Sequence, residues 1–332
     1  MSKHQKGQFF TTQSEYILQG FTYPPETKRV IEPFAGKKDL LSFLPSSVSA
    51  ECYDIEPQSA DIIQRDTLRF PPDYRGAFVI TNPPYLARNK AEEKEIFDLY
   101  HTNDLYKCFL LQLLDHKPDG GILIIPLNFW CSVRISDIEL RSRWLETFEI
   151  IQLNIFEEPV FDDTTCAVCS FQFQTRTHPS SVPLTFYPSC ESLEVDLNDS
   201  NSYLVGGEIY NLPVSGRYSI RRITLSNENQ RNTNLRAKCI DDKELIHLSI
   251  VEDSCVYVDQ TEDQTGRTYA SFVIDPPLSL SLQTSLVSEF NRWFTEYRKK
   301  YHSLFLSNYR DSRRKRISFD LLYRIMAYLI EK

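Results

Sequence analysis

The sequence lacks any run of 18 apolar residues, and its first residues, MSKHQKGQFFTTQ, contain no apolar core of a signal peptide. Its eight cysteines are unevenly spaced, which is not the pattern of a disulfide framework. Cys166 and Cys169 have the C-x-x-C spacing, but on a strand they would point to opposite faces, and no second cysteine pair lies nearby. These absences predict a cytoplasmic protein with reduced core thiols and no metal site.

Short apolar runs alternate with helical patterns in the first half of the chain. Strands are expected over residues 29–35, 49–56, 77–84, 120–130, 149–156 and 167–174, and helices over 96–117 and 135–148. This alternation predicts an α/β fold, a doubly wound and mostly parallel sheet of the Rossmann-like kind with ligands at the carboxyl ends of its strands. After residue 175 the pattern changes to a linker, short strands and late helices, so we expect one domain over 1–175 and an α+β domain over 176–332.

Acidic residues recur at the ends of successive expected strands. Glu32, Pro33 and Gly36 form a tight turn after the first strand, where a glycine lets the backbone approach a ligand. Asp54 ends the second strand 18 residues after Gly36, an interval typical of a carboxylate that binds ribose hydroxyls. Asp66 follows, placed to accept a hydrogen bond from an adenine amino group. Neither G-x-G-x-x-G nor G-x-x-x-x-G-K-[ST] is complete, so the pattern predicts a pocket for an adenosine-containing cofactor without a pyrophosphate.

The stretch TNPPY, residues 81–85, ends the third strand with a carboxamide, two prolines and an aromatic ring. By itself, Asn-Pro-Pro is also consistent with a turn that simply ends a strand. After the acidic strand ends, it resembles the catalytic motif of the gamma class of DNA adenine-N6 methyltransferases of restriction–modification systems, including those carried by large algal viruses. Further blocks similar to that family occur in order between about residues 8 and 173: GQFFTTQ, EPFAG, CYDIEP, QRDTL, DLYKCFLLQLLDHKPDGGILIIPLNFW and IFEEPVFDDTTCAVCSFQF.

The resemblance implies S-adenosyl-L-methionine as the cofactor and assigns residues to two groups. The implied cofactor-binding residues are Thr11, Glu32, Pro33, Gly36, Asp54, Ile55, Asp66, Thr67 and Asn82, and the implied catalytic residues are Asn82, Pro83, Pro84, Tyr85 and Phe161. The family's cofactor loop usually has a second glycine where this chain has Lys38. The ammonium of Lys38 could instead meet the cofactor carboxylate.

The implied reaction explains the residues of TNPPY. An adenine amine is a poor nucleophile because its lone pair is delocalised into the ring. Two acceptors on its N–H bonds, the Asn82 side-chain oxygen and the Pro83 carbonyl, can aim the lone pair at the methyl group, and the prolines hold the turn rigid. The target base must be flipped out of the duplex. Tyr85 then offers a face for stacking, and Phe161 would pack opposite it, unless Phe161 is an ordinary core residue.

Charge is unevenly distributed along the chain. The net charge is −8, but residues 292–324 contain ten Lys and Arg against three acids. This basic run predicts double-stranded DNA as a partner, with a solvated helix face as the alternative. The expected phosphate contacts come from Arg310, Arg313, Arg314, Lys315 and Arg316. Residues 225–236, rich in Asn and Arg, are either a base-reading loop or a solvated surface loop. We expect a monomer, with a restriction endonuclease that acts on the same DNA site without contacting it.

Two other functions remain open. The same NPPY geometry suits the amine of adenine in RNA or the side-chain nitrogen of a glutamine in a release factor. Release-factor enzymes usually carry their extra domain before the cofactor loop, whereas only 31 residues precede that loop here. A non-catalytic DNA-binding protein that has kept the fold is the other possibility, and Lys38 is its only support.

Overall fold

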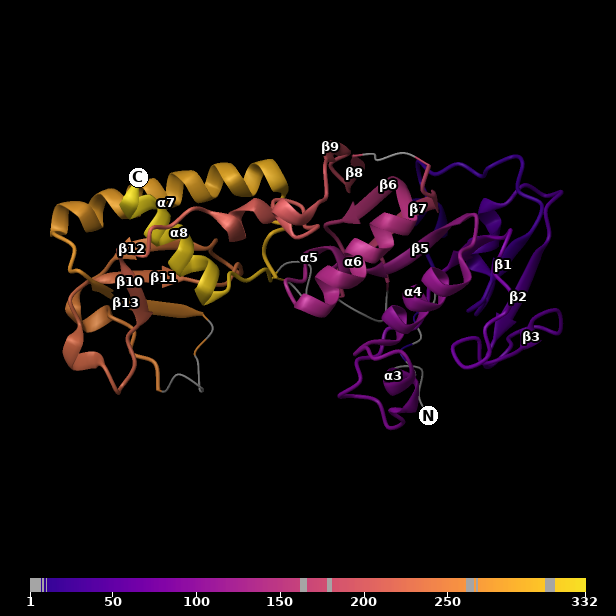
Figure 1. Ribbon diagram of the computed structural model, residues 1–332, viewed down its shortest axis with the longest axis horizontal. Helices are drawn as coiled ribbons and strands as arrows, with labels where there is room; N and C mark the ends of the chain where they lie inside the picture. Colours follow the sequence, from indigo (N-terminus) through magenta and orange to yellow (C-terminus); the bar gives the residue numbers. More distant parts are fainter. Residues whose placement is uncertain are drawn as a thin grey trace. The chain divides into compact units, whose positions relative to one another are not determined.

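The computed structural model describes residues 7, 9, 11–161, 166–177, 181–260, 266, 268–307 and 314–332. The chain forms two compact units, Met1–Leu197 and Asn198–Lys332 (Figure 1). The change in sequence pattern predicts a boundary after residue 175, but the boundary between the two units lies after Leu197. The difference arises because β8 (Val182–Tyr187) pairs in parallel with β6 (Phe148–Phe156), and β9 (Glu191–Val195) pairs with β8, so both strands extend the sheet of the first unit.

A nine-stranded sheet organises the first unit and confirms the predicted α/β fold. Its order is β3-β2-β1-β4-β5-β7-β6-β8-β9. The other strands are β1 (Val30–Glu32), β2 (Ala50–Asp54), β3 (Ile63–Gln64), β4 (Phe78–Thr81), β5 (Gly120–Pro126) and β7 (Val168–Thr175). Strands β3, β2, β1, β4 and β5 run parallel, and β7 runs antiparallel between β5 and β6. The carboxyl ends of β1, β2 and β4 consequently lie at one edge of the sheet.

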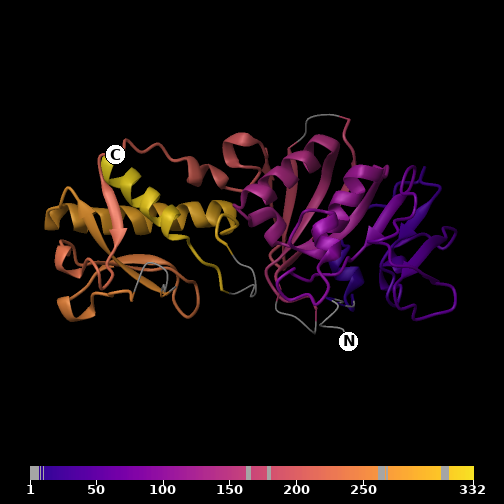
Figure 2. The same cartoon turned by 60° about the horizontal axis from the view of Figure 1, so that its bottom comes forward.

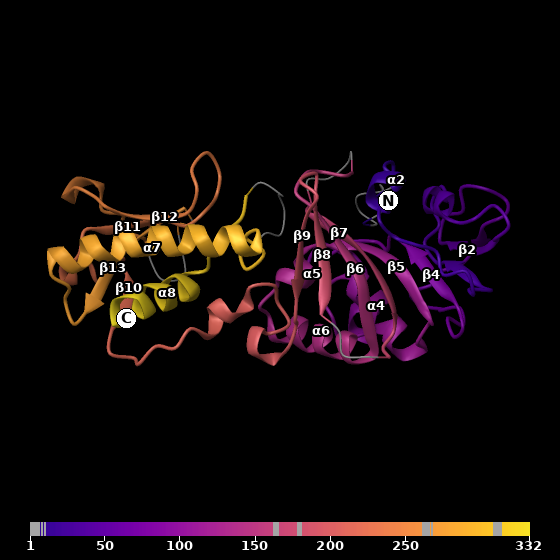
Figure 3. The same cartoon turned by 90° about the horizontal axis from the view of Figure 1, so that it is seen from above.

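Two long helices, α4 and α6, lie along one face of this sheet (Figure 3). The helices of the unit are α2 (Ser14–Ile17), α3 (Glu95–Leu99), α4 (Leu105–His116), α5 (Asn128–Cys131) and α6 (Ile135–Thr147), with a 3-10 helix, η1 (Asp39–Phe43). The single helix predicted over residues 96–117 is wrong, because the chain turns at His101, where φ is a left-handed 49°. Between α4 and α6, the Lys107 ammonium contacts Asp137 Oδ1 at 2.5 Å, and both side chains are buried.

One hydrophobic cluster joins the N-terminal segment to the middle of the sheet. It contains Phe78, Ile80, Ile122 and Ile124, which are alternate residues of β4 and β5 and so share one face. Ile17 and Phe161 belong to the same cluster. The site described below therefore lies against the core of the unit.

Buried polar side chains fasten the N-terminal segment to the sheet. Ser170, Asn154 and Gln172, on β7 and β6, donate hydrogen bonds of 2.7, 2.9 and 2.8 Å to the backbone carbonyls of residues 17, 19 and 22. Because buried carbonyls need partners, these three bonds fix the path of the segment. The residues that precede α2 start from this fixed point.

The second unit is built on a four-stranded antiparallel sheet of order β10-β13-β11-β12. Its strands are β10 (Ser219–Arg222), β11 (Leu235–Lys238), β12 (His247–Ile250) and β13 (Tyr269–Asp275). Short 3-10 helices lie at η2 (Asp199–Asn201), η3 (Gly207–Asn211), η4 (Glu228–Gln230) and η5 (Asp253–Cys255). Helix α7 (Leu280–Tyr301) packs on β12, and α8 (Phe319–Glu331) packs on β10 and on α7 (Figure 2). Ser279 and Ser318 cap these two helices through their side chains. No helix in the described ranges is long and apolar enough to cross a membrane.

Candidate cofactor and catalytic site

A cavity of about 430 Å³ opens where β1, β2 and β4 end. Eight of the nine residues predicted to bind the cofactor line it: Thr11, Glu32, Gly36, Asp54, Ile55, Asp66, Thr67 and Asn82. The ninth, Pro33, accepts a 2.9 Å hydrogen bond from Thr67 Oγ1 through its carbonyl, which is one way in which the loops after β1 and β3 are joined. The structure thus brings together residues that are up to 71 positions apart in the sequence.

The carboxylate of Asp54 organises the loop after β1. Its Oδ2 accepts a hydrogen bond from the Gly36 amide and its Oδ1 accepts one from the Glu56 amide, each at 2.8 Å. Gly36 has a φ of 50°, which an L side chain adopts only at a cost. Each carboxylate oxygen has a second lone pair, so Asp54 can hold this turn and still accept bonds from a ligand.

Lys38 adopts a left-handed conformation, with a φ of 63°, at the position where the resembling family has glycine. Its ammonium forms an ion pair with Asp61 and holds the pKa of that carboxyl down at about 2. The cavity is lined by Lys37 and Asp39, on either side of Lys38. The loop therefore keeps a glycine-like backbone, and the Lys38 ammonium is engaged with Asp61 instead of a cofactor carboxylate.

The cavity is acidic. Its lining includes Glu32, Asp39, Asp54, Glu56, Asp66, Glu92 and Glu93 against Lys37, Arg65 and Arg69. Glu32 is 1% exposed, and its Oε2 has no hydrogen-bond partner among the described residues. Burial, and then the neighbouring Asp39 and Asp54, raise the pKa of Glu32 well above its usual value. Such a lining favours a ligand that brings positive charge and hydrogen-bond donors, and it disfavours a polyphosphate.

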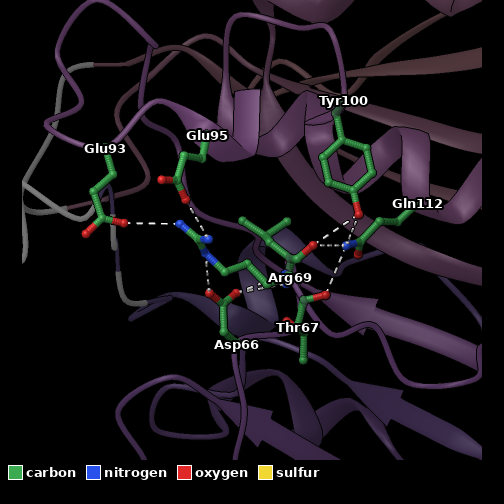
Figure 4. A network of polar contacts seen from close by, with 8 residues as sticks. Asp66, Thr67, Arg69, Glu93, Glu95, Tyr100 and Gln112 are labelled. Carbon is green, nitrogen blue, oxygen red and sulfur yellow. Dashed lines mark hydrogen bonds and ion pairs between the residues drawn. The ribbon is translucent and has the colours of Figure 1, made fainter. Parts of the chain in front are cut away.

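Asp66 belongs to a polar network at the cavity (Figure 4). Its Oδ1 accepts bonds from the backbone amides of residues 68 and 69, at 3.1 and 3.2 Å, and its Oδ2 lies 3.4 Å from Arg69 Nε. Arg69 also pairs with Glu93 at 3.2 Å and Glu95 at 3.1 Å, in the segment that follows TNPPY. Arg69 was not predicted as a site residue, because no local motif relates position 69 to positions 93 and 95.

The side-chain amide of Asn82 is oriented by the residues that precede α2. Its Nδ2 donates to the Phe9 carbonyl at 2.9 Å and to Thr11 Oγ1 at 3.2 Å. Its Oδ1 accepts a hydrogen bond from the Tyr85 hydroxyl, which also lies 2.7 Å from the Ile124 carbonyl. Of the two prolines, Pro84 lines the cavity and Pro83 is buried. The predicted catalytic loop is therefore in contact with the predicted cofactor cavity.

The two predicted aromatic residues both contact Phe9. The ring centroids of Phe9 and Tyr85 are 5.6 Å apart with an interplanar angle of 31°, and those of Phe9 and Phe161 are 6.3 Å apart with an angle of 28°. Phe161 is 4% exposed and belongs to the core cluster, so it is also a core residue. Phe9 was not among the predicted site residues, although it lies within the GQFFTTQ block.

Part of the predicted DNA-binding run has structural contacts of its own. Arg310 and Arg313 lie outside the described residues. Arg314 is exposed, whereas the Lys315 ammonium donates to the His302 carbonyl at 3.0 Å. Arg316 forms two backbone hydrogen bonds with residue 307. The run is therefore only partly a solvent-facing charge cluster.

Three asparagine side chains of the candidate reading loop, residues 225–236, form hydrogen bonds within the second unit. Asn227 exchanges hydrogen bonds with the backbone of residues 222 and 224, and Asn232 with that of residue 274. Asn234 donates to the Val251 carbonyl and to Asp253. These three side chains stabilise the second unit.

Comparison with known protein families gives a match that covers part of the first unit. Residues 74–161 match the Eco57I restriction-modification methylase family. The matched range includes TNPPY and Phe161, and it confirms the predicted resemblance to methylases of restriction–modification systems over those residues. Among curated proteins, no match to the chain was found.

Solved structures with a similar fold include the methyltransferase subunit of a type I restriction-modification system from Streptococcus thermophilus, with 13% identity over 55% of this chain and 48% of that chain and a TM-score of 0.42. The type IIL restriction-modification enzyme MmeI in complex with DNA has 13% identity over 79% of this chain and 48% of that chain, with a TM-score of 0.46. The chain spans about half the length of the first structures that it matches. At these identities and TM-scores the likenesses do not indicate which reaction the chain performs.

Proposed function

We propose that this chain is a DNA methyltransferase that transfers the methyl group of S-adenosylmethionine to the N6 amine of adenine in a short duplex sequence, with the target base flipped out of the helix. The observation that carries the proposal is the position of Asn82. Its side chain lines an acidic cavity at the carboxyl end of β4 and is oriented there by two hydrogen bonds from its own Nδ2.

The cavity suits this cofactor in charge and size. S-adenosylmethionine supplies, when bound, a methyl group already activated on a positively charged sulfur. The Glu32 oxygen that has no partner within the described part of the chain is suited to an ammonium group, and Asp54 retains acceptor capacity for ribose hydroxyls. Ile55, which is 49% exposed, lines the same cavity with an apolar side chain. A volume of about 430 Å³ lies in the range of small-molecule sites.

Asn82 and Pro83 would act on the adenine amine as hydrogen-bond acceptors. The two bonds donated by Asn82 Nδ2 fix the orientation of the amide, and its Oδ1 is the acceptor, held in this structure by the Tyr85 hydroxyl. The Pro83 carbonyl can accept the second N–H, since proline offers an acceptor and no donor. Neither group takes the proton that the amine loses on methylation, which passes to water, and the thioether S-adenosylhomocysteine is the other product. Their contribution is to position the nitrogen lone pair, which is what an already activated methyl donor requires.

Duplex DNA is the proposed partner of the second unit, and the first unit is the proposed catalytic domain. The support is the concentration of Lys and Arg in residues 292–324 on a chain of net charge −8. Arg314, Lys299 and Lys300 are exposed members of this run. Phosphate contacts from such residues would position the duplex without specifying its sequence.

The test uses plasmid DNA from a host without DNA methylation, methyl-labelled S-adenosylmethionine and digestion of the DNA to nucleosides. We expect the label in N6-methyladenine. The Asn82→Ala variant should lose on the order of a hundredfold or more of this activity, the size expected when one preorganised polar contact to the reacting group is removed. Its cofactor affinity in calorimetry should fall far less than its activity. Label in RNA, in protein or in cytosine would replace the proposed substrate, and substantial turnover by Asn82→Ala would remove the proposed role of that residue.

A further inference from the structure

A third ring, that of Phe9, contacts both aromatic residues of the proposed base site. Phe9 lies within contact distance of both Tyr85 and Phe161, at small interplanar angles to each. A flat base stacked between Tyr85 and Phe161 would need the same contacts. Phe9 comes from the residues before α2, more than 70 positions before the Tyr85 loop in the sequence. A ring of the protein therefore contacts the same two residues that the proposed function assigns to the base.

The hydrogen-bonding position of the base amine is filled as well. The Tyr85 hydroxyl donates to Asn82 Oδ1, the atom that the proposed function assigns to the adenine N–H. Burial raises the pKa of Tyr85 well above its usual value, so the hydroxyl stays protonated and remains a donor. Its ring is also packed edge-on against Tyr106, with centroids 6.2 Å apart. Tyr85 thus points toward the core, and its hydroxyl donates the hydrogen bond to Asn82 Oδ1 that the proposed function assigns to the adenine amine.

Three hydrogen bonds hold Phe9 in this position, and all three come from the catalytic loop. The Tyr85 amide donates to the Gly7 carbonyl at 2.9 Å, and Asn82 Nδ2 donates to the Phe9 carbonyl and to Thr11 Oγ1. The contact is close, because a β-carbon on Gly7 would lie 2.6 Å from the Tyr85 carbonyl oxygen. The chain beyond this arm, residues 17–22, is fixed separately to β6 and β7. The attachment of residues 17–22 does not depend on the Phe9 side chain, so the ring can be displaced while the backbone bonds of Gly7 and Phe9 stay in place.

We propose that the protein occupies its own base site in the absence of a flipped base, with Phe9 in place of the adenine ring and the Tyr85 hydroxyl in place of the adenine amine. A base enters by displacing the Phe9 ring and turning the Tyr85 hydroxyl away from Asn82. This inference rests on the proposed function. Phe9 then acts as an internal competitor, because the fraction of protein with an open site sets the apparent affinity for the base. Entry is favoured only for a base that makes better contacts than Phe9 does.

The first experiment measures KM and kcat on unmethylated plasmid DNA for the wild type, Phe9→Leu and Phe43→Leu. Leucine keeps an apolar side chain at position 9 but removes the stacking face. We expect Phe9→Leu to lower the KM for DNA about tenfold, the size expected for one stacked ring, with kcat unchanged or raised. Phe43→Leu is the matched control, since Phe43 is half-buried against the same core cluster but lies in η1. Its KM should equal that of the wild type.

A raised KM in Phe9→Leu would show that Phe9 is a permanent wall of the base site and would overturn the proposal, and so would an unchanged KM. If the wild type methylates no DNA, the proposed function falls and this inference falls with it. If the wild type methylates DNA but Phe9→Leu has no lower KM, the proposed function stands and only this inference falls. A second measurement replaces Phe9 by 4-cyanophenylalanine and follows its nitrile stretch in the infrared. We expect the nitrile to be more hydrated with plasmid DNA and S-adenosylhomocysteine than in the free protein, and a spectrum unchanged by DNA would contradict the displacement.

Discussion

Asp54, at the end of β2, and Lys38, on the loop after β1, contact different partners. Asp54 binds the Gly36 and Glu56 amides and lines the cavity, whereas the Lys38 ammonium is paired with Asp61. A backbone with a φ of 63° at Lys38 shows that the loop geometry is set by its surroundings and tolerates a side chain. The two residues therefore make a matched pair for testing which side chain at the cavity binds the cofactor.

We expect Asp54→Ala to weaken S-adenosylmethionine binding by ten- to a hundredfold, because a hydrogen bond to a charged group contributes about 1.5–3 kcal/mol. Lys38→Ala should leave the affinity unchanged, since its ammonium is engaged elsewhere. Calorimetric titration of both folded variants makes the comparison. Equal affinity in Asp54→Ala and the wild type would remove Asp54 from the site, and a loss in Lys38→Ala would restore a contact between its ammonium and the cofactor.

We expect the stability of the fold to depend on pH through Asp104, the residue just before α4. Its Oδ1 has no hydrogen-bond partner among the described residues, and burial raises the pKa of Asp104 to about 6. A carboxyl with a raised folded-state pKa stabilises the fold when it is protonated. That contribution is complete below about pH 4, the usual pKa of an aspartate, and it is lost as the pH rises to about 6.

The Asp104→Asn variant should therefore gain stability relative to the wild type as the pH increases from 4 to 7. A raised pKa of about 6 corresponds to a gain on the order of 3 kcal/mol. Urea denaturation of both proteins at pH 4, 5, 6 and 7 measures it. Parallel stability curves for the two proteins would show that Asp104 does not titrate in this range.

At the scale of elements, local patterns predicted most of the sheet and failed where partners are distant in sequence. Strands β1, β2, β4 and β5 fall within predicted runs, and β6 and β7 each extend one residue beyond theirs, since apolar periodicity is a local property. The attachment of β8 to β6 depends on pairing between residues about 30 positions apart, which no local pattern records. The break between α3 and α4 depends on the left-handed turn at His101.

At the site, too, residues in local sequence motifs could be predicted, whereas contacts between residues far apart in the chain could not. Thr11, Glu32, Gly36, Asp54 and Asn82 lie in recognisable blocks, so their gathering at one cavity could be predicted. Phe9 is in such a block too, but its contacts with Tyr85 and Phe161 depend on how the chain folds back over the loop. The contacts of Arg69 with Glu93 and Glu95 have no sequence signal, since many surface charges could pair instead.

The buried contact between Lys107 and Asp137 joins α4 to α6, and only 3% and 2% of the two side chains are exposed. Asp137→Ala should destabilise the fold by about 3–5 kcal/mol, because it leaves an uncompensated buried ammonium. The double variant Lys107→Met, Asp137→Leu should recover most of this loss, since well-packed apolar residues often replace a buried pair without cost. Urea denaturation measures both. A loss below 1 kcal/mol in Asp137→Ala would show that Asn103, 2.9 Å from the ammonium, is a sufficient partner.

At the scale of the whole molecule, the two units divide chemistry and charge between them. The first unit contains the acidic cavity, and the second contains the basic run over residues 292–324. Within the run, Arg298 is committed to Asp241 and the Lys315 ammonium to the His302 carbonyl. Lys299, Lys300 and Arg314 are exposed, which makes them the members best suited to test contact with a polyanion.

We expect the combined change Lys299→Gln, Lys300→Gln and Arg314→Gln to weaken binding to every duplex, whatever its sequence. Each lost phosphate contact should also flatten the dependence of log affinity on log salt by roughly 0.9. Preference among target sequences and affinity for the cofactor should not change, because phosphates carry no sequence information and the cavity belongs to the first unit. Arg75→Gln is the control, since Arg75 is an exposed arginine of the first unit paired with Asp73. Affinities at three salt concentrations distinguish the two outcomes, and a triple variant whose slope equals that of Arg75→Gln would place the DNA contacts outside these three residues.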